Sequence, residues 1–121
     1  MTKEEIKNKT LAELMNAVGK DNAISMQELY RFVFNKEPTH DIHGTRAIRK
    51  VITELRKEGV PIASTTSKGT GGYYIPVGSE REEYCRSIRN RALKLLQMEA
   101  KIRKSSLPHI IHEISLSLGG K

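Results

Sequence analysis

GTRAIRKVITELRKEGVPIASTTSKGTGGYYIP, residues 44–76, changes its periodicity once, at Gly59. Before Gly59 the apolar residues recur at the i, i+3, i+4, i+7 spacing that lines one face of an α-helix: Ile48, Val51, Ile52 and Leu55. Gly59 is suited to end this helix, because a residue without Cβ readily adopts the left-handed conformation common at helix C-termini. After it, two β-favouring runs flank a glycine-rich segment. The stretch predicts a helix over about residues 44–58 and a β-hairpin over about 62–75.

The predicted helix is basic on the side away from its apolar stripe. At about 100° per residue, five side chains project from that side or its flank: Arg46, Arg49, Lys50, Thr53 and Lys57. Lys68 lies in the tip of the hairpin that follows directly. A basic helix joined to such a hairpin is typical of the recognition helix and wing of a winged helix-turn-helix domain. The pattern therefore predicts double-stranded DNA as the partner, with the helix in the major groove and the wing on the backbone.

Within that class, the residues resemble the N-terminal DNA-binding domain of the biotin-repressor family. The resemblance covers roughly residues 1–76, and it rests on two runs: Ala47, Ile48, Lys50, Ile52, Leu55, Arg56, Gly59 and Val60 in the helix, and Lys68, Gly69, Gly72, Tyr73 and Pro76 in the wing. It implies DNA-binding roles for Arg46, Arg49, Lys50 and Thr53 on the matched helix and for Lys68 in the matched wing. It stops before any ligase domain, so neither biotin nor ATP is implied and no cofactor is expected.

Charge is unevenly spread along the 121 residues, whose formal net charge is +7. Residues 1–43 carry six Lys and Arg against seven Asp and Glu, whereas residues 44–121 carry fifteen against seven. A basic second half suits a polyanion-binding surface, because neutralising phosphates releases condensed counterions. A solvated basic surface without a partner explains the charge equally well, but its position on the helix favours nucleic acid.

The N-terminal part predicts two helices, each opened by a capping box. The first begins at Thr2 and is closed by Gly19, with a restart at Thr10 as an alternative, and the second begins after Ser25. Ala23 and Ile24 are expected to form a short strand between them, and the buried positions of the second helix are predicted at Leu29, Phe32 and Val33. Free N–H groups at a helix start suit a phosphate, so Ser25 and Gln27 are DNA-contact candidates, as is Thr45 at the start of the recognition helix.

Beyond Gly78, a further capping box at Ser79 predicts a long helix to about Lys104. Its apolar stripe contains Tyr84, Ile88, Leu95 and Ile102, which predict a homodimer, although Arg91 and Glu99 interrupt the stripe and packing within one chain stays open. Cys85 is expected to be a small core residue. A last helix is expected with Pro108 in its first turn and apolar residues from Leu107 to Leu118. The expected fold class is mainly α with a small β-hairpin (α+β): a winged helix-turn-helix domain, residues 1–78, and a C-terminal helical extension, residues 79–121.

No residue pattern supports catalysis or a metal site. His40 and His43 have no further ligands near them, and His109, His112 and Glu113 do not follow the H-E-x-x-H spacing of zinc proteases. The single cysteine and the absence of a long apolar run predict a cytoplasmic protein that does not span a membrane. The expected function is that of a small transcriptional regulator or phage-type DNA-binding accessory factor, not an enzyme. The alternative is a winged helix that assembles a protein complex through its basic face and C-terminal helices.

Overall fold

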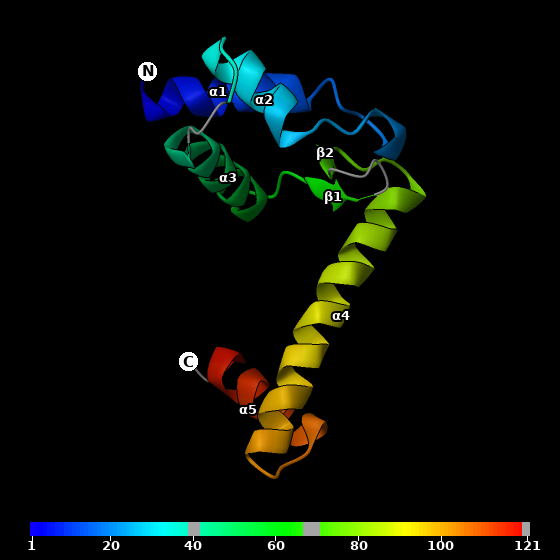
Figure 1. Cartoon of the computed structure of the whole chain (residues 1–121). Helices are drawn as coiled ribbons and strands as arrows, with labels where there is room; N and C mark the ends of the chain where they lie inside the picture. The colour runs from blue at the N-terminus through cyan, green and yellow to red at the C-terminus, as the bar shows by residue number, and fades with distance from the viewer. Residues whose placement is uncertain (39–41, 67–70, 120–121) are drawn as a thin grey trace. The chain divides into compact units, whose positions relative to one another are not determined.

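The computed structural model describes residues 1–38, 42–66 and 71–119, and these form helices with one small hairpin (Figure 1). The expected mainly α fold with a two-stranded antiparallel hairpin is confirmed. The chain divides into two compact units, residues 1–82 and 83–121. In chain order the elements are α1 (Lys3–Leu14), the 3-10 helix η1 (Lys20–Asn22), α2 (Met26–Phe34), α3 (Ile42–Lys57), β1 (Ala63–Thr65), β2 (Gly72–Tyr74), α4 (Ser79–Ile102) and α5 (Leu107–Gly119).

The core of the first unit lies between α1, α2 and α3, which contact one another pairwise. The periodic positions of α3 all point inward. The fully buried apolar side chains of this core are Leu14, Leu29, Tyr30, Val33, Ile48, Ile52, Leu55 and Ile62. The predicted burial of Phe32 is wrong, because this side chain is 47% exposed and Tyr30 is buried in its place. The two residues lie on opposite flanks of the Leu29–Val33 stripe, and only the flank that carries Tyr30 faces the core.

The first helix ends earlier than expected. Thr2 caps it as predicted, since its side chain accepts a hydrogen bond from the Glu5 N–H. The predicted closure at Gly19 is wrong, because α1 stops at Leu14. The next residues pair with the end of the hairpin instead: the Ile75 N–H donates to the Ala17 carbonyl at 2.8 Å, and the Gly19 N–H donates to the Ile75 carbonyl at 2.9 Å. Tertiary pairing therefore takes the backbone groups that a longer helix would have used.

The hairpin is tied to the segment just before α2. β1 and β2 are antiparallel with Ala63 opposite Tyr74, and Ile24 forms a further antiparallel bridge with Tyr73, as expected of the short strand. The Ile24 and Tyr73 N–H groups each donate to the other residue's carbonyl at 2.8 Å. Gly72 permits this approach, since a Cβ there would lie 3.1 Å from the Ala23 Cβ. These two hydrogen bonds thus fix the segment before α2 against β2.

The second unit contains most of α4 together with α5. Lys104 adopts a left-handed conformation after α4, and the Ser105 N–H donates to the Ala100 carbonyl at 2.8 Å, which is the hydrogen bond of a Schellman helix end. Ser106 caps α5, because its hydroxyl accepts from the His109 N–H at 3.2 Å. The small core of this unit includes Ala100 and Ile110. The expectation that Cys85 is a core residue is wrong, since its side chain is exposed.

Candidate nucleic-acid interface

The predicted recognition surface lies on the outer side of α3. Because the other side of the helix is anchored by Ile48, Ile52 and Leu55, the basic residues are left in solvent. Five predicted contact residues are exposed there: Arg46, Arg49, Lys50, Thr53 and Lys57. Four of these residues are cations: Arg46, Arg49, Lys50 and Lys57. Within the described parts of the chain, none of the four forms a salt bridge. Their positive charge is therefore not neutralised by the fold and is free to act on an anionic partner.

Among the predicted contact residues of α3, Arg49 borders the hairpin. It lines an open groove of about 230 Å³ together with residues of the hairpin and of the start of α2: Met26, Ser64, Thr65, Thr66, Gly71, Gly72 and Tyr73. Hydroxyl groups on this wall donate and accept hydrogen bonds, and the guanidinium of Arg49 presents several donors in a fixed plane. The groove thus combines one unneutralised cation with a polar wall, which suits a phosphate or the edge of a base.

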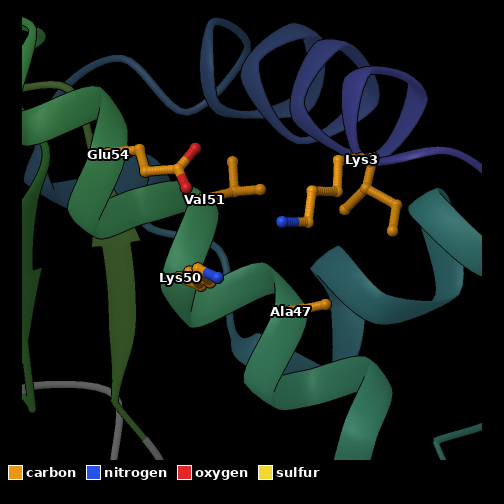
Figure 2. A pocket seen from close by; sticks show the side chains of 6 residues that line it. Lys3, Ala47, Lys50, Val51 and Glu54 are labelled. Atoms are coloured by element: carbon orange, nitrogen blue, oxygen red, sulfur yellow. The ribbon is translucent and has the colours of Figure 1, made fainter.

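Lys50 lies on the opposite edge of α3, toward α1. Figure 2 shows it beside a small pocket between the two helices, with Lys3 extending from α1 into the same space. This pocket has a volume of about 70 Å³ and is lined by Lys3, Ile6, Ala47, Lys50, Val51 and Glu54. Glu54 brings a negative charge to this edge. Arg49 and Lys50 are adjacent in sequence, yet Arg49 borders the hairpin and Lys50 borders α1.

The hydroxyl and amide candidates have structural bonds of their own. The Ser25 hydroxyl accepts from the Glu28 N–H at 3.2 Å and also bonds to the Glu28 carboxylate, so it completes the capping box of α2. The Thr45 hydroxyl donates to the Ile42 carbonyl, and that of Thr53 to the Arg49 carbonyl, both at 3.1 Å. Gln27 is exposed in the first turn of α2. Of this group, Gln27 alone has a side chain without a hydrogen bond among the described residues.

The remaining predicted site residues are Lys68 and four residues of α4. Lys68 lies outside the described residues. The predicted dimerisation residues lie on α4: Tyr84 is half-buried, and Ile88, Leu95 and Ile102 are 43%, 64% and 76% exposed. In a single chain the stripe is therefore largely uncovered.

Arg56 is a positioning residue that sequence reasoning did not assign to the site. Its Nε donates to the Ile62 carbonyl at 2.8 Å and its Nη2 to the Ser64 hydroxyl at 3.1 Å, so it joins the end of α3 to β1. The signal in the sequence was its place in the run that resembles the biotin-repressor family, six residues before Ile62. Arg56 thereby holds one wall of the groove that Arg49 lines.

Replacing Arg56 with glutamine is expected to lower the free energy of unfolding by about 1.5 kcal/mol, the low end for hydrogen bonds from a charged donor, because the side chain is exposed. Urea denaturation measures this change. The matched control is Arg46→Gln, which removes the same charge from α3 but no hydrogen bond within the described residues. Equal stability of the two variants would contradict the positioning role.

Among the described residues, no group of three or more His, Cys, Asp and Glu side chains is placed to hold a metal ion. The helices within those same residues include none with the length and apolar character needed to cross a membrane. Comparison of the chain with protein-family models, curated proteins and solved structures finds no match.

Proposed function

We propose that the chain is a sequence-specific double-stranded DNA-binding protein that acts as a small transcriptional regulator in the cytoplasm. The observation that carries the proposal is the row of exposed, unneutralised cations on α3 beside the polar groove of the hairpin. The resemblance of residues 47–76 to the DNA-binding domain of the biotin-repressor family supports it. The order of three helices followed by a hairpin also suits a winged helix that places α3 in the major groove.

The positions of the cations divide their roles. Arg49, next to the groove, is assigned to a base edge, where arginine commonly contacts guanine with two hydrogen bonds. Arg46 and Lys57 are eleven residues apart, which corresponds to about 16 Å along a helix. The two side chains stand toward opposite ends of α3 and do not line the groove beside Arg49, so they are assigned to phosphates.

The second unit is assigned to homodimer formation. Ile88, Leu95 and Ile102 recur every seven residues on α4 and are uncovered in the single chain. Burying this stripe against a second copy is favourable at roughly 25 cal/mol per Å² of apolar area, before the costs of association. Two linked recognition helices would then bind a site with two symmetric halves about one turn of DNA apart.

The test is binding to duplex DNA at several salt concentrations, followed by selection from a random-sequence duplex pool. Affinity should fall linearly on logarithmic axes as salt rises, and the pool should converge on a symmetric sequence. Salt-independent binding, or a pool that stays random, would contradict sequence-specific recognition and favour the role as a protein-interaction module.

Lys57→Ala is expected to weaken binding to all duplexes alike and to reduce the salt slope by about one, as loss of one phosphate contact does. The same titration with Lys9→Ala removes an equal charge from an exposed position of α1 and should leave the slope nearly unchanged. A selective loss for one base pair in Lys57→Ala would show that this residue reads sequence instead.

A further inference from the structure

The apolar residues on the exposed face of α4 are spaced symmetrically about Leu95, and two residues of opposite charge are spaced symmetrically about it as well. Seven residues before and after Leu95 stand Ile88 and Ile102, and four residues before and after stand Arg91 and Glu99. All five belong to one continuous helix, α4 (Ser79–Ile102), so their spacing along its axis is regular. At 100° per residue they fall on one side of the helix, with Arg91 and Glu99 on opposite flanks of the apolar seam.

This symmetry has a consequence for two copies of the helix. If one copy is turned end over end about Leu95, each Ile88 lies level with Ile102 of the other copy. Each Arg91 then lies level with the other copy's Glu99, across the seam. The two charges that interrupt the apolar stripe are thereby placed as complementary partners.

The alternative orientation brings like charges together. In a parallel, in-register pair every residue of α4 lies level with its own copy, so Arg91 would lie across the seam from Arg91 and Glu99 from Glu99. Like charges placed in this way are destabilising. Within the described residues Arg91 has no salt bridge, while Glu99 bonds to Arg103 through an exposed contact of 2.8 Å. Arg91 is thus free for an intermolecular partner, and Glu99 can accept a second one with its other oxygen.

We propose that the α4 face joins two copies of the chain in antiparallel orientation, with the two-fold axis at Leu95 and two Arg91–Glu99 salt bridges between the copies. The inference rests on the homodimer of the proposed function and adds its orientation and register. The salt bridges select this register because a shift along the seam places Arg91 against apolar residues, where an unpaired charge is costly. The partner is therefore a second copy of this chain.

Disulfide cross-linking of the full chain tests the orientation. Cys85, which is exposed, is first replaced by serine. Ile88→Cys and Ile102→Cys are then introduced separately into this cysteine-free chain. One of the two variants carries a size tag, so that mixed cross-links can be told from cross-links of a variant with itself. The antiparallel register predicts a disulfide between the two variants when they are mixed. Neither variant alone should cross-link, because two copies of Ile88 would lie about 21 Å apart along the axis, far beyond the reach of a disulfide.

The outcomes separate the two proposals. Cross-linking of each variant with itself, in protein that sediments as a dimer, would overturn the antiparallel register and leave the homodimer standing. Sedimentation of the unmodified chain as a monomer at micromolar concentration would overturn both. Mixed cross-links alone support both.

A charge exchange tests the salt bridges independently. Arg91→Glu places two acidic groups level with each other at both ends of the seam, and it should weaken the dimer by roughly tenfold, as expected for losing two exposed pairs. Arg91→Glu combined with Glu99→Arg restores opposite charges and should recover most of that loss. Arg89→Glu makes the same charge change off the seam and serves as the control. If the single and double variants dimerise equally, the proposed pairing is wrong.

Discussion

Simultaneous replacement of Arg46, Arg49 and Lys50 with alanine is expected to abolish sequence-specific DNA binding in a protein that remains folded. Arg49→Ala alone should cost roughly 1–3 kcal/mol, the range for a bidentate base contact, and should blur the preference at one position. Loss of Arg46, which is assigned to a phosphate, should also lower the salt slope by about one. Together these losses should reduce specific affinity to the level of non-specific binding.

The fold should survive because these side chains point into solvent. All three are exposed on α3, and none forms a salt bridge with another described residue. Alanine also has the highest helix propensity, so the helix itself should not weaken.

Circular dichroism and urea denaturation verify the fold, and titration with the selected duplex measures affinity. A second triple variant, with Lys9, Lys20 and Lys36 changed to alanine, removes the same net charge from exposed positions outside α3. This control should retain most of the specific affinity. Unchanged affinity in the folded α3 variant would contradict the assignment of α3 as the recognition helix.

The central helix and hairpin could be predicted because several local signals agree there. The apolar period of α3 is regular over two turns, and Gly59 adopts the left-handed conformation that its position suggested, with φ of +96°. Directly after Gly59, the Val60 N–H donates to the Leu55 carbonyl at 3.0 Å, the hydrogen bond of a Schellman helix end. When period, cap and turn residues point the same way, the local sequence is sufficient.

The end of α1 was mispredicted because it depends on a distant segment. Gly19 is a residue type that commonly ends a helix. In the structure its N–H donates instead to the carbonyl of Ile75, which lies more than fifty residues later. No pattern near Gly19 reveals that partner. Similarly, the choice between Tyr30 and Phe32 depends on which flank of α2 meets the other helices, and helical period alone leaves both flanks open.

The candidate site shows the same division between local and tertiary information. The sequence identifies which side of α3 is basic, but it does not reveal which edge faces the hairpin. In the structure, Arg49 lies on the edge that faces the hairpin and lines the groove there. Lys50 lies on the other edge, beside α1. Arg56 was overlooked for the same reason, because its bonds to Ile62 and Ser64 depend on how the chain turns after Gly59.

Leu95→Glu is expected to give a folded monomer whose binding to a symmetric duplex is roughly a hundredfold weaker. Leu95 is 64% exposed in the single chain, so a carboxylate there remains hydrated and the fold of one chain should tolerate it. In a dimer built around Leu95 the two new carboxylates would meet at the centre of the seam and lose their water, which is costly without a partner. The loss on DNA follows because linked half-sites gain about 10²–10⁴ in affinity over a single one.

Sedimentation measures the oligomeric state. Titration with the full symmetric duplex and with a single half-site distinguishes loss of the dimer from loss of DNA contacts within one chain. The variant should bind a single half-site as well as the unmodified protein does, since the α3 surface is unchanged. Leu116→Glu is the matched control, because Leu116 is 59% exposed on α5 and lies outside the α4 seam. If Leu95→Glu and the unmodified chain bind the symmetric duplex equally, then the two recognition helices are not linked through α4.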